Sequence, residues 1–326
     1  MTTFIQLVGL PGSGKSTLAM DLCIEYNAIH LSSDDIRSEQ FGDEQSQAHN
    51  QAVFSEMEKR TKAALSSGIN VVFDATNLNR KRRRHFINHI VKSNHKIVYY
   101  MNTSIEEIRK RNQTRSRKVD DQVIDKMYTA LHIPILGEGW DRIIYVGPDS
   151  RIQKKDRDII EDKLRIDLGH DQLFDSLSTE MIEFKNILNL PHDSTYHSFS
   201  VSRHTYYVYQ YILNHYHKDD KPEMIWAALF HDTGKSFCKS FTSFKGEETK
   251  YAHYYGHEFV SSQIASSRLN SLGYNEELIR NVSTLVQFHM IPMNATEKKL
   301  AETKELLGDH LFRKLLFLHE ADMQAK

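Results

Sequence analysis

Residues 9–17 read GLPGSGKST, and this stretch decides the fold of the first part of the chain. It directly follows a short apolar run, TFIQLV at residues 3–8, and leads into a segment of helical character. Residues 9–16 fit the phosphate-loop pattern of Gly, four residues, Gly, Lys and Ser or Thr, which lies between a strand and a helix. The sequence therefore predicts a strand, a glycine-rich loop and a helix that together bind a nucleotide.

The residue types in this loop suit the phosphates of a nucleotide. Small residues let backbone amides curl around phosphate groups, and the N-terminus of the following helix adds partial positive charge. Lys15 is expected to contact the β- and γ-phosphates and Ser16 to hold Mg²⁺, so ATP or another nucleoside triphosphate is the expected ligand. The residues expected to bind it are Gly9, Gly12, Ser13, Gly14, Lys15, Ser16 and Thr17.

Four further apolar segments alternate with helical stretches before residue 148. They are NAIHLS at 27–32, GINVVFD at 68–74, HKIVYYM at 95–101 and DRIIYV at 141–146. Strands that alternate with helices indicate a parallel sheet with crossover helices. We therefore predict an α/β P-loop domain over residues 1–150.

The pattern changes after residue 150. Residues 151–170 are rich in charge and are predicted to be a linker, and the chain beyond has helical periodicity with little period-two alternation. We therefore predict an all-α domain over residues 171–326. Its expected helices lie within residues 173–188, 204–216, 223–232, 256–272, 276–290 and 309–324.

The composition of the 326-residue chain narrows the class of protein. With 40% hydrophobic residues it can bury the cores of two domains. No apolar stretch is long enough to cross a bilayer, and the N-terminus lacks the basic start of a signal peptide. Two cysteines, Cys23 and Cys238, are too few for a disulfide framework. We expect a cytoplasmic protein without a membrane partner, in the host cytoplasm if it is phage-encoded.

The net charge of −1 hides an uneven distribution. Residues 80–118 contain 13 basic and two acidic side chains, concentrated in NRKRRRHF at 79–86 and RKRNQTRSRK at 109–118. Such a stretch attracts polyanions, including nucleic acid. The alternative is a solvated basic surface without a partner.

A group that could activate an acceptor follows the second predicted strand, in SSDDIR at residues 32–37. Either Asp34 or Asp35 could take the proton from an attacking hydroxyl as a general base. Arg37, one helical turn beyond Asp34, could hold a phosphate of the acceptor. The alternative is that this group caps the helix and pairs on the surface.

At this point the sequence resembles the 5′-OH polynucleotide kinase domain of phage and bacterial RNA-repair enzymes, over about residues 1–148. The resemblance implies that Asp34 is the general base, that Arg37 holds the acceptor 3′-phosphate and that Asp74 helps to organise the acceptor site. It also places Arg111 and Arg115 in lid positions, where an arginine stabilises charge on the transferring phosphoryl group. The motifs that carry it are GLPGSGKST, SSDDIR, FDATNLN and RKRNQTRSRK followed by DKMY.

The second domain is rich in histidine at positions that suit a metal site. His204 lies at the start of a predicted helix, His231 and Asp232 at the end of another, and Asp322 near the end of the last. Two imidazoles and two carboxylates suit a divalent transition metal, namely Mn²⁺, Fe²⁺, Co²⁺, Ni²⁺ or Zn²⁺. Each histidine alone has a structural explanation, but together the set predicts metal-assisted phosphoester hydrolysis.

The order of His, His-Asp and Asp resembles the HD phosphohydrolase superfamily, and over about residues 175–326 the HD domain of bacterial CCA-adding enzymes. That family is associated with 2′,3′-cyclic phosphodiesterase and 2′- or 3′-phosphatase action on RNA ends. The segments that carry the resemblance are PHDSTYHSFSVSRHT, ALFHDTGK, YYGHEFVSSQIA, LVQFHM and LFLHEAD.

This second resemblance implies that His204, His231, Asp232 and Asp322 bind one metal ion. His257 and His289 are candidates for a second metal ion or for holding the scissile phosphate, and Lys235 is expected to neutralise phosphate charge. The weaker candidates are His192, His197 and His253, whereas the pair His170 and Asp171 lies outside a suitable context.

Together the two domains predict an RNA end-healing enzyme. One would phosphorylate 5′-OH ends and the other would remove 2′,3′-cyclic, 2′- or 3′-phosphates, leaving ends that a separate RNA ligase can join. The expected substrates are ends of broken tRNA or other RNA, with DNA as an alternative. Two other hypotheses are a small-molecule kinase joined to an HD nucleotidase acting on free nucleotides, and a non-catalytic, ATP-regulated RNA-binding switch.

Overall fold

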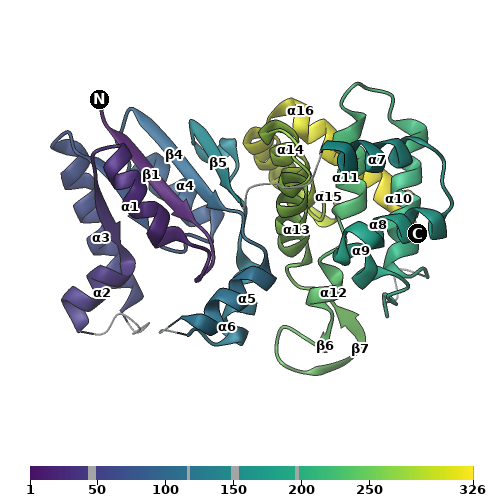
Figure 1. The fold of residues 1–326 in the computed structure, drawn as a ribbon, viewed down its shortest axis with the longest axis horizontal. Coiled ribbons are helices and arrows are strands. Elements are labelled where there is room, and N and C mark those ends of the chain that lie inside the picture. Colours follow the sequence, from purple (N-terminus) through teal and green to yellow (C-terminus); the bar gives the residue numbers. More distant parts are fainter. Residues whose placement is uncertain (43–48, 116–117, 148–153, 195–197, 326) are drawn as a thin grey trace. The chain divides into compact units, whose positions relative to one another are not determined.

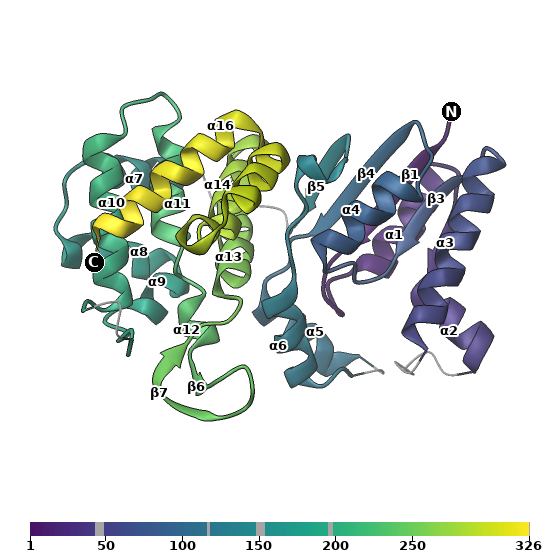
Figure 2. The same cartoon turned by 180° about the vertical axis from the view of Figure 1, so that it is seen from behind.

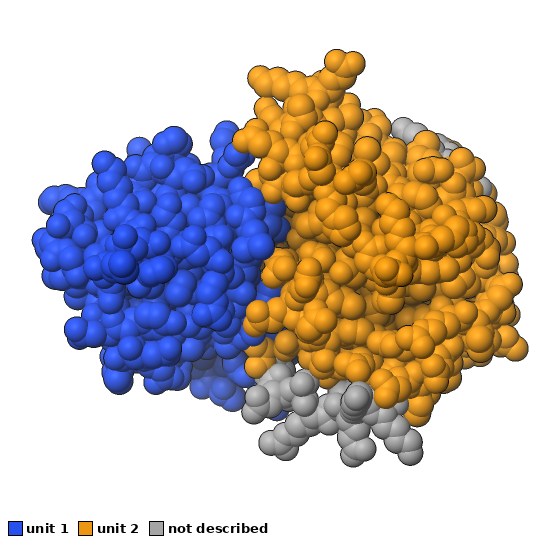
Figure 3. Space-filling model, turned by 90° about the horizontal axis from the view of Figure 1, so that it is seen from above, with its two compact units in different colours: residues 1–127, 134–146 blue, residues 128–133, 147–326 orange. Residues whose placement is uncertain are grey.

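The computed structural model describes residues 1–42, 49–115, 118–147, 154–194 and 198–325. The chain forms two compact units (Figure 3). The first comprises residues 1–127 and 134–146, and the second comprises residues 128–133 and 147–326.

A five-stranded parallel sheet forms the centre of the first unit (Figure 1). Its strand order is β2-β3-β1-β4-β5, so the α/β fold predicted from the sequence is confirmed. Because β1 lies between β3 and β4, the loop after β1 lies where the strand order reverses, which is where ligands bind in such sheets. The strands are β1 (Thr3–Val8), β2 (Ala28–Ser32), β3 (Asn70–Asp74), β4 (His95–Met101) and β5 (Arg142–Val146).

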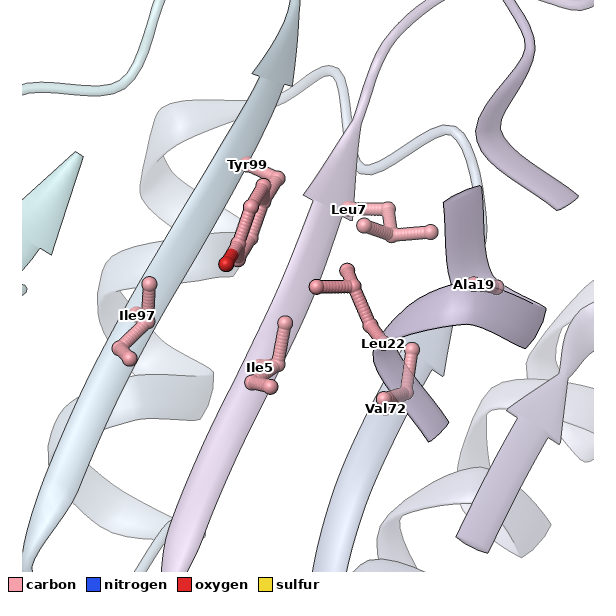
Figure 4. Close-up of a cluster of buried hydrophobic side chains, with 7 residues drawn as sticks. All are labelled: Ile5, Leu7, Ala19, Leu22, Val72, Ile97 and Tyr99. Carbon is pink, nitrogen blue, oxygen red and sulfur yellow. The ribbon is translucent and has the colours of Figure 1, made fainter. Parts of the chain in front are cut away.

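Helices cover both faces of this sheet. On one face, Ile5 and Leu7 of β1 pack with Leu22 of α1 (Figure 4). On the other face, Phe86 of α4 packs on Phe73 of β3, with ring centroids 4.8 Å apart. The helices are α1 (Lys15–Glu25), α2 (Ser33–Phe41), α3 (Asn50–Ser66), α4 (Arg80–His89), α5 (Ile105–Thr114), α6 (Asp121–Ala130) and the 3₁₀ turn η1 (Leu136–Glu138).

One arginine of the basic stretch belongs to the interior of the first unit. Arg83 is buried and forms two hydrogen bonds with the buried carboxylate of Glu138, at 2.7 and 2.8 Å. It also donates to the carbonyls of Asn77 and Leu78 at 2.8 and 3.0 Å, and so fixes the chain that follows β3. Arg83 is therefore structural, whereas its neighbours Arg82 and Arg84 are exposed.

The second unit is built mainly of helices (Figures 1 and 2). The all-α prediction missed an antiparallel hairpin of β6 (Ser240–Thr242) and β7 (Glu248–His253), which turns through Gly246 at φ 86°. The helices are α7 (Lys154–Arg165), α8 (His170–Glu180), α9 (Ile182–Ile187), α10 (Val201–His215), α11 (Lys221–Phe230), α12 (Lys235–Cys238), α13 (His257–Ser271), α14 (Glu276–Phe288), α15 (Ile291–Asn294) and α16 (Glu297–Gln324).

Helix α11 is the central element of the second unit. All seven residues from Met224 to Phe230 are buried, as expected for a helix that is apolar on every side. The helix ends in the interior, so the polar residues that follow it are buried too. None of the helices in the described ranges combines the length and apolar character needed to cross a membrane.

The chain between the two predicted domains takes part in the second unit. Residues 151–170, predicted as a linker, contain α7, whose Leu164 is buried and whose Leu164 carbonyl accepts from the Tyr209 hydroxyl at 3.0 Å. Residues 128–133 also count with this unit, where Gln263 donates to the Tyr128 carbonyl at 2.8 Å. The boundary predicted near residue 150 lies outside the described residues.

Candidate active sites

The phosphate loop has a backbone that requires glycine. Gly12 and Gly14 have φ of 82° and 95°, in the left-handed region that other residues adopt with strain. A Cβ atom on Gly9 would lie 2.7 Å from Met101 Cβ and 2.8 Å from Ser13 Oγ. Gly9 therefore packs closely against Met101, with no room for a side chain. Gly14 directly precedes α1, so the first backbone amides of that helix are directed at the loop.

Lys15 folds back over the loop. Its Nζ donates to the carbonyl of Leu10 at 2.8 Å. Burial lowers the pKa of Lys15 to about 8, although the carboxylates of Asp74 and Asp34 oppose this shift. A phosphate beside this ammonium would stabilise its positive charge, so the loop fits a polyphosphate ligand. Ser16 and Thr17 are exposed at the start of α1.

The two lid arginines predicted from the sequence lie at the phosphate loop. A Cβ atom on Gly14 would lie 3.6 Å from Arg111 Nη1, and one on Gly12 would lie 3.9 Å from Arg115 Nη1. Arg111 is oriented by Glu107, which accepts from its Nε at 2.8 Å. Two positive side chains therefore stand beside the loop where phosphoryl charge would develop.

The structure distinguishes the two aspartates that follow β2. Ser32 caps α2, because its hydroxyl accepts from the backbone amides of Asp34 and Asp35 at 3.2 Å each. Asp34 Oδ1 lies 2.6 Å from Arg37 Nη1, whereas the Asp35 side chain is 76% exposed. Arg37 itself is 6% exposed and is held from its other side by Asn50 at 3.0 Å. The geometry therefore favours Asp34 over Asp35 as the partner of Arg37.

Asp74 lies at the end of β3, on the phosphate side of the site. Burial opposes its ionisation, but a hydrogen bond from His30, the charge of Lys15 and the hydroxyl of Ser16 lower the pKa of Asp74. A carboxylate beside the loop serine suits Mg²⁺ that accompanies a nucleotide. The role of Asp74 in organising the acceptor stays a prediction.

Sequence reasoning missed His30 in this unit. Its Nε2 lies 3.3 Å from Asp74 Oδ2, and its Nδ1 lies 3.9 Å from Asp35 Oδ2. The hydrogen bond to Asp74 raises the pKa of His30. A polar residue inside the predicted strand at 27–32 was the signal that could have found it.

In the second unit, six predicted ligands come together in two sets. His204, His231 and Asp322 form one set, and Asp232, His257 and His289 form the other, with ligand atoms inside each set within 4.8 Å of one another. All six side chains are buried. They come from the start of α10, the end of α11, the start of α13, the end of α14 and the end of α16.

Asp232 lies between the two sets. Its Oδ2 atom is 3.3 Å from His231 Nε2 and 3.7 Å from His204 Nε2. Its Oδ1 atom is 3.4 Å from His257 Nε2 and 3.9 Å from His289 Nε2. One carboxylate therefore faces both sets, so Asp232 could serve either set as a ligand to a divalent metal ion.

The four imidazoles are oriented by backbone carbonyls. The Nδ1 atoms of His231, His257 and His289 lie 2.7–2.8 Å from the carbonyls of Ala228, Tyr254 and Val286. His204 Nδ1 lies 3.0 Å from the Ala325 carbonyl. Because a carbonyl can only accept, each Nδ1 must carry the proton, and each Nε2 of a neutral ring is left with a lone pair.

The Nε2 atoms of these rings face one another in two pairs. His204 Nε2 and His231 Nε2 are 3.2 Å apart, and His257 Nε2 and His289 Nε2 are 3.3 Å apart. Burial, together with the neighbouring His257 and His231, lowers the pKa of His289 to about 3, so its ring is neutral. Two neutral rings would repel at this distance unless a proton or a metal ion lay between their nitrogens. The side chains present therefore fit divalent metal ions.

Lys235 and His192 complete this centre. Lys235 Nζ lies 2.6 Å from Asp232 Oδ2 and 3.1 Å from His192 Nε2. His192 was only a weak candidate from the sequence, yet it is buried beside the ligands and its Nδ1 donates to the Phe199 carbonyl at 2.8 Å. The sequence offered no signal for this role beyond the nearness of His192 to His204 in the chain.

Three other histidines named from the sequence are accounted for differently. His170 pairs with Asp171 at 2.7 Å and with Ser202 at 3.2 Å, and belongs to neither ligand set of the described residues. His253 contacts the Tyr255 hydroxyl at 3.2 Å. His197 lies outside the described residues.

Gly234, in the sequence HDTGK, serves packing rather than phosphate binding. A Cβ atom there would lie 2.5 Å from the His257 carbonyl oxygen and 2.7 Å from Ser261 N. The Gly234 amide donates to Ser261 Oγ at 2.8 Å. Gly234 therefore lets the chain after Asp232 approach the first turn of α13, which carries His257.

The fold and the sites define an enzyme that joins a kinase-like nucleotide-binding unit to a metal-binding unit of hydrolase type. Comparison with protein families agrees with both assignments. A family model described as an AAA domain, of P-loop kinase-like type, matches residues 4–134. A family model described as an HD domain matches residues 196–322. None of the curated proteins compared with the sequence matches it.

Proposed function

We propose that this enzyme heals broken RNA ends. Its first unit would transfer the γ-phosphate of ATP to a 5′-OH end, and its second unit would remove a 2′,3′-cyclic, 2′- or 3′-phosphate from the other end. The observation that carries the proposal is the pairing of Asp34 with the buried Arg37 beside the phosphate loop. A general base next to a cation suits an acceptor hydroxyl whose nucleotide also carries a phosphate.

The residues of the first unit suit a direct phosphoryl transfer. Asp34 would accept the proton of the 5′-hydroxyl while the hydroxyl oxygen bonds to the γ-phosphorus of ATP. The bond between the γ-phosphorus and the bridging oxygen would break, and ADP would leave. Arg37 would hold the 3′-phosphate of the acceptor nucleotide. Lys15, Arg111 and Arg115 would stabilise the negative charge on the transferring group.

The surface of the first unit also suits a polynucleotide. Lys81, Arg82 and Arg84 of α4 are exposed, and their charge would attract the phosphates of an RNA strand without reading its sequence. Arg117, in the basic stretch at 109–118, lies outside the described residues.

In the second unit, His204, His231, Asp232 and Asp322 would hold one metal ion, and Asp232, His257 and His289 would hold a second. Bound divalent ions supply Lewis acidity toward a phosphate ester and its attacking water. Lys235, fixed by Asp232 and His192, would neutralise charge on the phosphate. The four backbone carbonyls that accept from the Nδ1 atoms would keep the rings in place.

The products define the enzyme's place in a reaction sequence. A ribonuclease that leaves a cyclic phosphate and a 5′-OH would supply its substrate. A separate RNA ligase that needs a 3′-OH and a 5′-phosphate would use its products. Broken tRNA is the first substrate to test, in a cytoplasmic setting.

The test uses a nicked anticodon stem-loop with a 2′,3′-cyclic phosphate and a 5′-OH, incubated with ATP, Mg²⁺ and Mn²⁺. We expect both a new 5′-phosphate and a new 3′-OH. Asp34→Ala should remove only the first product, and Asp322→Ala only the second. Phosphorylation of a nucleoside but not of the RNA would instead favour a small-molecule kinase, and neither product in any metal would contradict the proposal.

A further inference from the structure

The β6–β7 hairpin presents an unusual surface beside the metal centre. Figures 1 and 2 show that it projects from the helices next to α12. Four aromatic side chains on or beside it are exposed: Phe241, Phe244, Tyr251 and Tyr255. Phe244 is the most exposed of the four, at 86%, and together the four rings form an apolar group of the kind that marks an interaction site.

Positive side chains lie among these rings. Lys250 Nζ lies 5.3 Å from the centroid of the Tyr251 ring, and Lys239 Nζ lies 5.9 Å from that of Phe241. Lys239 is bound to Asp193 at 2.6 Å and fixes the base of the hairpin, whereas Lys250 is exposed. The exposed lysines of the hairpin are Lys245 at the turn and Lys250 in β7, with Glu247 and Glu248 between them in the chain.

A cavity of about 530 Å³ lies between the hairpin and the segment before α10. Phe241, Lys250 and Tyr251 line it from the hairpin, and His192 and Phe199 line it from the segment before α10. His192 contacts Lys235, which contacts Asp232. A molecule in this cavity would therefore lie one residue away from the group expected to bind the phosphate.

The hairpin is also fixed to the metal centre by its backbone. The Ala252 amide donates to the Asp193 carbonyl at 2.9 Å. Two residues later, the Tyr254 hydroxyl donates to the His192 carbonyl and the Tyr254 carbonyl accepts from His257 Nδ1 at 2.8 Å. The aromatic surface is therefore held at a defined position beside the ligands.

Exposed aromatic rings interleaved with lysine are the chemistry that binds single-stranded nucleic acid. Every base can stack on an aromatic ring, and lysine contacts the phosphates between bases. We propose that the β6–β7 hairpin and the adjoining cavity bind the last unpaired nucleotides of an RNA strand and so present its terminal phosphate to the metal centre. This inference rests on the proposed function and adds the surface that would bind the 3′-end substrate.

The test compares the full-length enzyme with Phe244→Ala, Tyr251→Ala and Lys250→Ala. The probe is a short single-stranded RNA with a 5′-fluorescein label, which blocks the kinase acceptor, and a 3′-phosphate. We expect each aromatic variant to raise Kd and the KM of dephosphorylation about tenfold. Hydrolysis of a small nitrophenyl phosphate ester should be unchanged, because that ester does not reach the hairpin.

Two variants serve as matched controls. Phe244→Trp keeps a ring for stacking and should restore RNA affinity, whereas Phe244→Leu keeps only apolar character and should not. Lys304→Ala removes another exposed lysine, from α16, and should leave the KM for RNA unchanged.

The outcomes separate this inference from the proposed function. Unchanged Kd and KM in all three hairpin variants, with normal RNA end hydrolysis, would overturn the inference and leave the function standing. RNA binding that depends on the hairpin, with hydrolysis of the small ester alone, would support the inference and contradict the proposed phosphatase. Loss of self-association in Phe244→Ala without any effect on RNA would assign the surface to a second copy and overturn the inference.

Discussion

The phosphate loop and the metal centre both serve phosphate chemistry, but they are built from different parts of the chain. The loop is one contiguous stretch, in which backbone amides around the turns at Gly12 and Gly14 would make most of the contacts with phosphate. The metal centre gathers side chains from His204 to Asp322 on five helices, and each imidazole is fixed by a carbonyl of the surrounding backbone. The loop therefore depends on backbone shape, and the metal centre on individual side chains.

This difference teaches where each site is vulnerable. A loop whose ligands are amides tolerates the loss of a side chain that points away from the phosphates. A centre whose ligands are side chains tolerates no such loss, and it also depends on the packing that brings its helices together. The predictions below test this contrast, from the largest expected effect to the smallest.

The largest effect is expected for Asp232→Asn. Asparagine has only one oxygen, and its amide nitrogen does not bind metal, so the side chain can no longer offer a ligand oxygen to both sets. Because loss of a supporting partner alone costs about 10–100-fold, we expect phosphate removal to fall by at least about 100-fold and bound metal to decrease. Kinase activity should be kept. Metal analysis and both assays measure this, with Asp309→Asn, an exposed aspartate of α16, as the control.

Arg83→Ala tests the assignment of this arginine to the interior. Removing it leaves the buried Glu138 carboxylate without its cationic partner, which should lower the free energy of unfolding by about 3–5 kcal/mol. Arg84→Ala, at the exposed neighbour, should change it by less than about 0.5 kcal/mol. Denaturant unfolding monitored in the first unit distinguishes them, and equal effects would contradict a structural role.

Gly234→Ala tests packing at the metal centre. A Cβ atom there meets the His257 carbonyl and Ser261 amide, so α13 must shift, at a cost of about 1–3 kcal/mol. We expect lower thermal stability and slower phosphate removal with an unchanged kinase. Gly169→Ala is the matched control, since its Cβ meets nothing within 4 Å. Unchanged phosphate removal in Gly234→Ala would mean that the close contact between Gly234 and α13 does not position His257.

The affinity for ATP should depend on pH through Lys15. Its pKa of about 8 means that the ammonium loses its proton above pH 8, whereas bound phosphate would keep it charged. ATP affinity should therefore be constant below pH 8 and fall about tenfold for each pH unit above it. Titration calorimetry across this range measures the slope. Lys15→Met should bind weakly with no such slope, and a slope that survives this change would assign it to another group.

The smallest effect is expected for Ser13→Ala. Ser13 lies in the loop, but its hydroxyl is buried and forms no hydrogen bond among the described residues. If the loop binds phosphate through its backbone, ATP affinity should change by less than about twofold, because no interaction with the ligand is lost. A large loss of kinase activity would show that this side chain, and not only its amide, contacts the nucleotide.

Local patterns predicted much of both units. Five apolar runs became the five strands of the parallel sheet, and SSDDIR began a helix capped by Ser32, as the spacing of short polar residues indicated. The helical character of the second unit was also predicted. The β6–β7 hairpin was missed because β6 is only three residues long, too short for period-two alternation to appear.

The sequence by itself determined the phosphate loop, because its ligands are neighbours in the chain and a loop of this pattern between a strand and a helix has one shape. The order of His204, His231-Asp232 and Asp322 also indicated a metal site, and the resemblance to the HD superfamily added His257 and His289 as candidates for a second metal ion or for the scissile phosphate. Only the tertiary structure decided that Asp232 faces both ligand sets and that Arg83 is buried. It also decided that His192 lies in the metal centre and that His30 contacts Asp74 near the phosphate loop. Those facts depend on distances between residues far apart in the chain, which packing sets and no local pattern encodes.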